Sequence, residues 1–329
     1  FAFFYDQTFK VFSTLIEFLT LSMNKNEYSL CIAPLTDLVN KYGLVPSTVK
    51  PETFNSNNTS RIDELITLKL KEDALTLRDM AKGKANINKL NDKKIEMLGE
   101  VYKMLVFAYG EPITEFTYTM RDCNNKVIST DKYTPKSFFE KFINKKLDTT
   151  YVMFMNDPTR DYYKLYEIEN DRHTMDGHNW KYINLPIEDI KDIAIKSIKD
   201  STMMYFSCDV GKFYDRDNGT LDVNNFDYGS LMGVNFSMDK KQRIETFASG
   251  SSHAMTLCAV DLDANNKPIK WMVENSWGKD AGYQGHLIMT DEWFNEYMFR
   301  LVAEKKYVSE KILNILNQKP IMLPAWDPM

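Results

Sequence analysis

Cysteine is scarce in this chain of 329 residues, and the four cysteines lie far apart: Cys31, Cys123, Cys208 and Cys258. Because no Cys-x-x-C pair occurs, neither a zinc site nor a redox dithiol is expected. This density is also too low for the disulfide framework of a small secreted protein. The cysteine content therefore favours a reducing compartment.

An excess of positive charge is absent as well. The chain has 41 Lys and Arg residues against 46 Asp and Glu residues, which gives a net charge of −5. A mildly acidic protein is poorly suited to coating nucleic acid. The lysine-rich segments at 69–71 and 82–94 fit a solvated helix face better than a nucleic-acid channel. We therefore do not expect nucleic acid as a partner.

Long uncharged hydrophobic runs are missing too. The apolar stretch over residues 1–23 is interrupted by Asp6, Lys10 and Glu17 at helical intervals, whereas a membrane helix needs about 20 mostly uncharged residues. We interpret this stretch as a buried amphipathic helix and expect no association with a membrane. Hydrophobic residues make up 43% of the chain. That share can fill a core, which excludes a disordered or fibrous protein.

Helical patterns dominate the first 200 residues, and strand patterns dominate the rest. Helices are predicted at 32–42, from Ser60, at 86–109, from Thr134-Pro135 and from Pro186. Strands are predicted at 115–120, 203–210, 254–260, 270–274 and 285–290. The sequence thus indicates an α+β protein whose main architectural boundary lies near residue 200.

Histidine, the most common catalytic base, occurs only four times. His173 and His178 lie in a polar stretch around a glycine, which is typical of a surface loop. His286 stands inside a strand pattern, and we interpret it as structural. His253 differs, because it stands at the edge of an apolar strand directly after a run of small residues. Small residues would allow a second group to approach this imidazole closely.

A second predicted strand delivers Asn275 and Trp277 to the neighbourhood of His253. The spacing of 22 residues between His253 and Asn275 suits two paired strands and their loop. The amide oxygen of Asn275 could then accept a hydrogen bond from one ring nitrogen of His253 and leave the other nitrogen to face a thiol. Trp277 could cover that hydrogen bond. Spacing alone fits equally a purely structural pair on neighbouring strands.

The motifs around these residues resemble the His/Asn half of papain-like cysteine peptidases. They are Ser-His-Ala-Met-Thr at 252–256, Val-Glu-Asn-Ser-Trp-Gly at 273–278 and Gly-Tyr-Gln-Gly-His-Leu at 282–287. Further motifs narrow the resemblance to the bleomycin hydrolase and aminopeptidase C family. They lie at 40–46, 156–158, 163–166, 208–212, 289–294 and 323–329, the last reading Leu-Pro-Ala-Trp-Asp-Pro-Met.

The resemblance implies a papain-like α+β fold with large helical insertions. It assigns 1–50 to the remainder of a helical left-hand subdomain, 51–200 to a mainly helical insertion region, and 201–329 to a β-rich right-hand subdomain with a C-terminal arm. It also implies a cytoplasmic homohexamer that needs no metal and no cofactor. Its substrates would be peptides with free N-termini, from which it removes the first residues.

The resemblance also implies roles for individual residues. By motif match, His253 is the general base that pairs with the nucleophilic thiol, and Asn275 is its orienting partner. Trp277 is expected to shield their hydrogen bond. In the family the C-terminus lies in the cleft and limits attack to free N-termini. Met329 is therefore expected to end near His253.

Three features of the family are absent from this sequence. The nucleophilic cysteine, in a Gly-Arg-Cys-Trp context, and the glutamine of the oxyanion hole would both lie before Phe1. The stretch Leu-Cys-Ile-Ala at 30–33 replaces the family's Gly-Gly-Gln-Trp. The family's short tail after Trp-Asp-Pro-Met does not follow Met329. None of the four cysteines here has the sequence context of the nucleophile.

Two explanations fit these departures. In the first, the protein is a cysteine aminopeptidase whose nucleophile lies upstream of Phe1, so that residues 1–329 alone do not hydrolyse peptides. In the second, it is a catalytically dead papain-like ring that acts as a binding or scaffold protein. The intact set of His253, Asn275 and Trp277 favours the first explanation, because a dead relative has no chemical reason to keep it.

Overall fold

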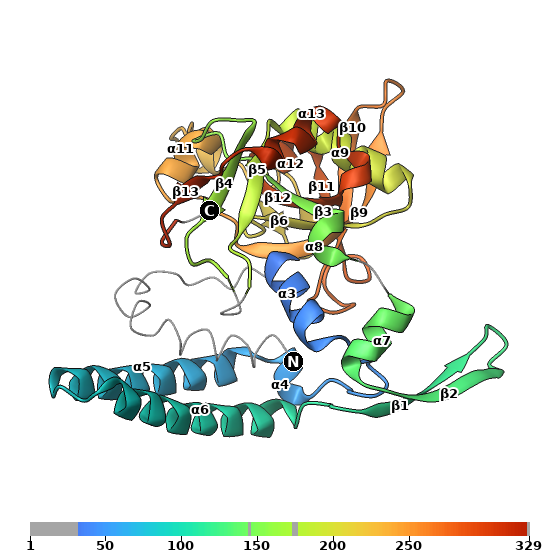
Figure 1. Ribbon diagram of the computed structural model, residues 1–329. Coiled ribbons are helices and arrows are strands. Elements are labelled where there is room, and N and C mark those ends of the chain that lie inside the picture. The colour runs from blue at the N-terminus through green and yellow to red at the C-terminus, as the bar shows by residue number, and fades with distance from the viewer. Residues whose placement is uncertain (1–31, 144–145, 173–176, 328–329) are drawn as a thin grey trace. The chain divides into compact units, whose positions relative to one another are not determined.

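The computed structural model describes residues 32–143, 146–172 and 177–327 (Figure 1). The helix expected over 1–23 lies outside these residues, and so do Cys31, His173 and Met329. No helix in these described ranges is long and apolar enough to cross a membrane.

The chain divides into two compact units. The described residues of the first come from Ala33–Asp148 and Asp171–His178, and those of the second from Thr149–Asn170 and from Asn179 onward. This division falls at 148/149, whereas the sequence pattern changes near residue 200. The difference arises because three short strands that precede residue 200 belong to the large sheet of the second unit.

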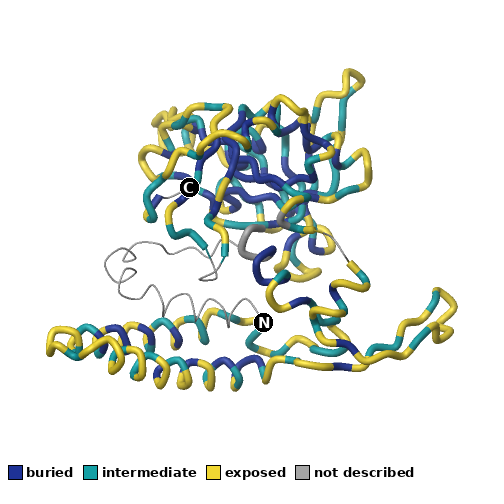
Figure 2. Tube along the Cα trace, in the orientation of Figure 1, coloured by how far each residue is buried: buried dark blue, intermediate teal, exposed yellow. Residues whose placement is uncertain are grey.

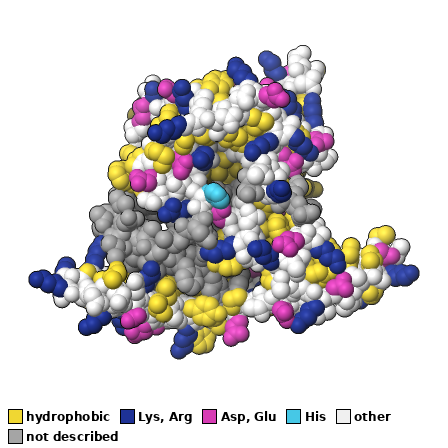
Figure 3. All heavy atoms as spheres, in the orientation of Figure 1, with side chains coloured by type: hydrophobic (Ala, Val, Ile, Leu, Met, Phe, Trp, Pro, Cys, Tyr) yellow, Lys and Arg dark blue, Asp and Glu magenta, His cyan; other side chains and the backbone are white. Residues whose placement is uncertain are grey.

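The first unit is mainly helical. It contains α3 (Ile32–Tyr42), α4 (Phe54–Asn57), α5 (Ser60–Lys82) and α6 (Ile87–Tyr109), of which only α4 was not predicted. Helices α5 and α6 form a long hairpin whose facing sides bury apolar residues at helical spacing, among them Ile66, Leu70, Ala74, Met97, Val101 and Leu105. Other apolar side chains of this unit stay exposed (Figure 3), including Phe54 and Phe107.

Capping residues set the ends of these helices. The Asn86 side chain accepts from the backbone of Lys89 at the start of α6, and Gly110 ends the helix with a positive φ of 74°. Strands β1 (Phe116–Arg121) and β2 (Val127–Tyr133) then pair as an antiparallel hairpin. A capping box of Thr134 and Ser137 starts α7 (Pro135–Phe142).

The second unit is built on one sheet of eleven strands. Their order is β13-β4-β5-β3-β12-β6-β9-β10-β11-β8-β7. One half contains β3 (Tyr151–Met155), β4 (Lys164–Ile168), β5 (Lys181–Asn184) and β13 (Ile321–Leu323). The other half contains β6 (Met204–Cys208), β7 (Tyr214–Asp215), β8 (Thr220–Leu221), β9 (His253–Leu262), β10 (Pro268–Glu274) and β11 (His286–Thr290).

Strand β12 (Met298–Glu304) joins the two halves, because it pairs with β3 on one side and β6 on the other. All seven of its residues are buried, even Arg300 and Glu304. Buried residues accordingly run through the middle of this unit in Figure 2. A strand buried on both faces reads as a continuous apolar run rather than an alternation, and no strand was predicted here.

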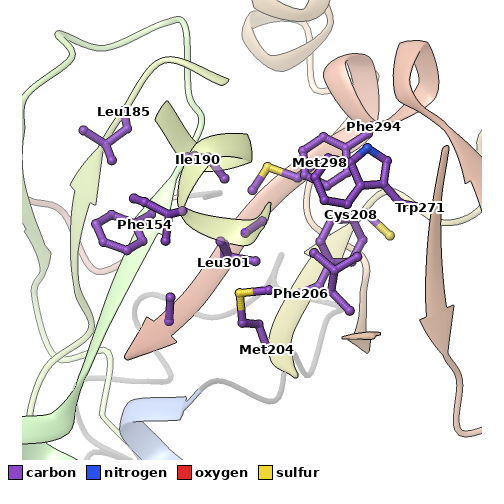
Figure 4. Packing of buried hydrophobic residues seen from close by; sticks show 14 of the residues in the cluster. Phe154, Leu185, Ile190, Met204, Phe206, Cys208, Trp271, Phe294, Met298 and Leu301 are labelled. Carbon is purple, nitrogen blue, oxygen red and sulfur yellow. The ribbon is translucent and has the colours of Figure 1, made fainter. Parts of the chain in front are cut away.

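Helices α9 (Ile187–Lys199) and α12 (Asp291–Tyr297) contact the sheet, the first at β9 and β12 and the second at β10, β11 and β12. The main hydrophobic core of the unit lies between these helices and the sheet, and Figure 4 shows part of it. Its largest members include Phe154, Phe206, Trp271 and Phe294. The shorter helices α8 (Leu147–Thr150), α10 (Tyr228–Met232), α11 (Lys240–Glu245) and α13 (Glu310–Leu313) complete the described chain, with 3-10 turns at Lys305–Tyr307 and Asn314–Asn317.

Candidate active site

His253 is the first residue of β9, so the sheet fixes its backbone. It lies opposite Cys208 in the antiparallel register between β9 and β6. The backbone N–H of Ser252, immediately before it, donates to the carbonyl of Cys208 at 3.0 Å. The imidazole therefore projects from a regular strand at the point where the strand begins.

Asn275 follows the last residue of β10, the strand that pairs with β9. Its own backbone N–H donates to the carbonyl of Gly285 at 2.8 Å, which holds the chain after β10 has ended. The antiparallel register of β9 and β10 brings Asn275 level with the start of β9. His253 Nε2 lies 2.8 Å from Asn275 Oδ1, so the predicted hydrogen bond is present.

The chemistry of this contact fixes the tautomer of His253. The Asn275 oxygen can only accept, and it also receives the backbone N–H of Ser276 at 2.8 Å. The proton of a neutral imidazole must then sit on Nε2, and Nδ1 is left with a free lone pair. A basic nitrogen held in this way can take a proton from a thiol and return it to a leaving group.

Trp277 lies against the imidazole. The two ring centroids are 4.8 Å apart with planes inclined by 32°, and the ring centroid of Tyr214 lies 5.8 Å from that of the indole. Asn275 is only 8% exposed, while 46% of Trp277 remains accessible to solvent. The indole thus contacts the imidazole and the ring of Tyr214, and it remains partly open to solvent.

Sequence reasoning missed the role of Asp209, the residue after Cys208. Its buried carboxylate accepts from the hydroxyl of Ser249 at 2.8 Å and from that of Ser252 at 3.3 Å. These contacts hold the run of small residues that leads into His253. The sequence signals were the motif at 208–212 and an acidic residue directly after an apolar strand, but the partners of Asp209 lie about forty positions away.

The described cysteines are poorly placed to act as nucleophile. Cys208 packs in the main core, where burial raises the pKa of its thiol well above the ordinary value (Figure 4). Burial also raises the pKa of Cys258, which stands five residues along β9 from His253, about 17 Å away. Cys123 lies in the exposed turn between β1 and β2, in the first unit.

The two other described histidines, His178 and His286, lie in a loop and in a strand as predicted. His178 lies in an exposed segment, where its Nδ1 is 2.8 Å from Asp37 Oδ1. His286 is the first residue of β11, and its ring nitrogen contacts loop carbonyls. Among the described residues, no cluster of three or more His, Cys, Asp or Glu side chains is arranged to bind a metal.

Comparison with known proteins decides the family. Residues 32–329 match the sequence model of the peptidase C1-like family. The chain belongs to the peptidase C1-like family. The match includes β9, β10 and the segment after β10, and hence His253, Asn275 and Trp277.

Relatives in the peptidase C1-like family carry the names that the sequence motifs suggested. The chain is 36% identical over 297 residues to aminopeptidase C of Streptococcus thermophilus and 34% identical over 301 residues to bleomycin hydrolase of Homo sapiens. Each match covers 90% of this chain and 66% of the relative. The chain thus spans about two thirds of the length of these relatives, and the predicted family is confirmed.

A solved structure shares the fold. PepW from Lactobacillus rhamnosis HN001 superposes with a TM-score of 0.91 at 32% sequence identity. The match covers 100% of this chain and 77% of the other. The α+β papain-like fold expected from the motifs is therefore confirmed.

Proposed function

We propose that this protein is a cysteine aminopeptidase that removes N-terminal residues from peptides, with His253 as its general base. The observation that carries the proposal is the hydrogen bond between His253 Nε2 and Asn275 Oδ1 beside the ring of Trp277. It leaves Nδ1 free to activate a thiol. The name of one relative, aminopeptidase C, supports a peptidase that acts at N-termini, and the name bleomycin hydrolase supports a hydrolase.

The proposed reaction proceeds in two halves. His253 Nδ1 takes the proton of the thiol, and the thiolate attacks the carbonyl carbon of the scissile peptide bond. The imidazolium then gives the proton to the leaving amine, which leaves an acyl thioester on the enzyme. In the second half His253 takes a proton from water, the hydroxide attacks the thioester, and the proton returns to the departing sulfur.

We place the nucleophilic cysteine outside residues 1–329, in a segment that precedes Phe1. Burial raises the pKa of the Cys208 and Cys258 thiols, which disfavours their reactive thiolate forms, and Cys123 is an exposed turn residue. None of them has a tryptophan neighbour in the sequence or the glycine-rich context of the family's nucleophile. Asn275 is the orienting residue in this proposal and Trp277 the shield.

We further propose that the chain end near Met329 lies close to His253 and limits attack to free peptide N-termini. A carboxylate there would pair with the ammonium group of the substrate and occupy the space of a longer peptide. We propose a homohexamer in the cytoplasm without metal or cofactor, which the sparse cysteines support.

The decisive experiment uses the protein expressed from its complete reading frame. We expect hydrolysis of a fluorogenic aminoacyl substrate under reducing conditions, and complete block by iodoacetamide at one cysteine upstream of Phe1. His253→Ala should abolish turnover while the circular dichroism spectrum and the melting temperature stay close to the parent values. A folded protein with no turnover and no upstream cysteine would overturn the proposal in favour of the scaffold.

A further inference from the structure

The run of small residues before His253 depends on hydrogen bonds for its conformation. It reads Ala-Ser-Gly-Ser-Ser over 248–252 and belongs to no helix or strand. These side chains have little apolar surface to bury, and the glycine gives the backbone more conformational freedom to lose on folding. Polar contacts must therefore hold the segment that delivers the imidazole.

Asp209 makes the charged contacts to this run. Its Oδ2 accepts from the hydroxyl of Ser249 at 2.8 Å, and its Oδ1 accepts from that of Ser252 at 3.3 Å. A hydrogen bond to an ionised acceptor is about twice as strong as one between neutral groups. Asp209 and Ser249 are both buried, whereas Ser252 is exposed. The bond from Ser249 is therefore the stronger of the two.

Neutral contacts hold the run at both of its ends. The hydroxyls of Ser207 and Ser251, both buried, lie 2.8 Å apart, and the backbone N–H of Ser252 donates to the carbonyl of Cys208 at 3.0 Å. At the start of the run, two successive backbone N–H groups donate to the carbonyl of Arg243 in α11, at 2.8 and 3.1 Å. The carboxylate of Asp209 ties the second residue of the run to the last one and so closes it into one fixed turn.

Asp209 itself has a fixed backbone. Its N–H donates to the carbonyl of Tyr297, the last residue of α12, at 3.0 Å, and its carbonyl accepts from the backbone of Lys212 at 3.1 Å. The ammonium group of Lys212 lies 3.9 Å from Asp209 Oδ2, which is beyond hydrogen-bond distance. The two serine hydroxyls are therefore the close side-chain partners of this carboxylate.

Asp209 and the imidazole lie on opposite faces of the sheet. His253 pairs with Cys208 in the antiparallel register of β9 and β6, so these two side chains share one face. Ser252 precedes His253, and Asp209 follows Cys208, so their side chains point to the other face. The carboxylate therefore acts on the imidazole through the backbone of the run.

We propose that Asp209 is a positioning residue for His253. By holding Ser249 and Ser252 it fixes the backbone from which the imidazole projects, and it keeps Nδ1 directed at the thiol. Asn275 fixes the rotation of the ring, and Asp209 fixes the place where the ring is attached. A displacement of about 1 Å in a reacting group can cost about a hundredfold in rate. This inference rests on the function proposed above.

Three variants of the complete protein separate hydrogen bonding from charge. Asp209→Ala removes the acceptor of both hydroxyls. Asp209→Asn keeps one acceptor oxygen and offers an N–H to the other hydroxyl, which can turn round and accept. Ser249→Ala removes the stronger bond and keeps the carboxylate. The matched control is Ser197→Ala, because Ser197 is also buried and donates its hydroxyl to the carbonyl of Thr202 at 2.9 Å, at the end of α9.

The first measurement is kcat/KM for an aminoacyl substrate, together with the rate of inactivation by iodoacetamide. Inactivation needs no substrate and reports how readily the thiolate forms. Both rates should fall about tenfold to a hundredfold in Asp209→Ala and about three- to tenfold in Ser249→Ala. They should stay within about threefold of the parent in Asp209→Asn, which can keep both hydrogen bonds, and be unchanged in Ser197→Ala.

Two outcomes of these rates would overturn the inference. Equal losses in Asp209→Asn and Asp209→Ala would show that the charge of Asp209 acts rather than its hydrogen bonds. A lower kcat/KM with an unchanged rate of inactivation would show that the run shapes the binding of substrate and does not position the base.

The second measurement is amide hydrogen exchange, which does not depend on activity. The amides of Ser249 and Ser252 should exchange about tenfold to a hundredfold faster in Asp209→Ala, while the amide of Asn275 exchanges at the parent rate. Should Asp209→Ala fail to fold, Ser249→Ala provides the same test with an increase of about three- to tenfold.

Hydrogen exchange also separates this inference from the proposed function. Unchanged exchange at Ser249 and Ser252 would overturn the role of Asp209 as an anchor. Faster exchange with unchanged reaction rates would overturn its link to the base. Inactivity of the parent protein would instead overturn the proposed function, and exchange would still decide whether Asp209 holds the run.

Discussion

The contact between His253 and Asn275 makes a quantitative prediction for Asn275→Ala in the complete protein. The substitution removes the acceptor of His253 Nε2 and lets the imidazole rotate and exchange tautomers. A hydrogen bond to a charged imidazolium is worth about 1.5–3 kcal/mol. Because 1.36 kcal/mol corresponds to a factor of ten, kcat/KM should fall about 10- to 150-fold.

The fold should tolerate this change. The backbone N–H of Asn275 keeps its bond to Gly285, and the exposed Ser276 can exchange the lost side-chain acceptor for water. The free energy of unfolding should fall by less than about 1.5 kcal/mol. A matched control is Asn179→Ala, which removes an amide bonded to Glu167 at 2.9 Å near the other edge of the sheet and should leave kcat/KM unchanged.

The assay is steady-state hydrolysis of an aminoacyl fluorogenic substrate, combined with denaturant unfolding of each variant. A kcat/KM for Asn275→Ala within twofold of the parent would refute the orienting role. An equal loss in the Asn179 control would show that the effect passes through the fold rather than through the imidazole.

Three further predictions concern the nucleophile, Trp277 and the buried Lys240. Residues 1–329 expressed alone should lose about six decades of rate, and activity equal to that of the complete protein would contradict the missing nucleophile. Trp277→Ala should lower kcat/KM about two- to tenfold, because water would reach the hydrogen bond between His253 and Asn275. An unchanged kcat/KM would contradict the shielding role of Trp277. Burial lowers the pKa of Lys240 to about 7 in the folded protein. Between pH 7 and 10 the unfolded chain therefore binds more protons than the folded one. The free energy of unfolding should then rise with pH, by at most about 1.4 kcal/mol per pH unit. Lys240→Met should remove that rise, which denaturant unfolding at several pH values measures. The same slope of the free energy of unfolding against pH in parent and variant would contradict the lowered pKa of Lys240.

Local signals in the sequence were sufficient for several elements. Asn86 and Gly110 mark the ends of α6, and Thr134-Pro135 marks the start of α7, because helix caps use only neighbouring residues. Strand patterns separated by turn-rich segments predicted β9, β10 and β11, because such patterns are local as well. The contact between His253 and Asn275 could be predicted because the strands β9 and β10 are consecutive in the sequence and pair with each other.

Contacts between distant parts of the chain could not be predicted in this way. Strand β12 carries Arg300 and Glu304, whose burial depends on strands far away in the sequence. The short strands β3, β4 and β5 have too few residues to show a period. Arg160 and Asp327 form an ion pair and stand 167 positions apart. No local sequence pattern around either residue predicts this ion pair, which forms only when the sheet is folded.

The position of β12 has a consequence for biosynthesis. During translation β3 and β6 leave the ribosome long before β12 does, because β3 ends at Met155 and β12 begins at Met298. Until then the two halves of the sheet have no strand to join them, and the edges of β3 and β6 stay open to other chains. The nascent polypeptide is therefore an aggregation-prone intermediate while the roughly 140 residues between Met155 and Met298 are made. We expect its yield in cells to depend on chaperones that cover these edges.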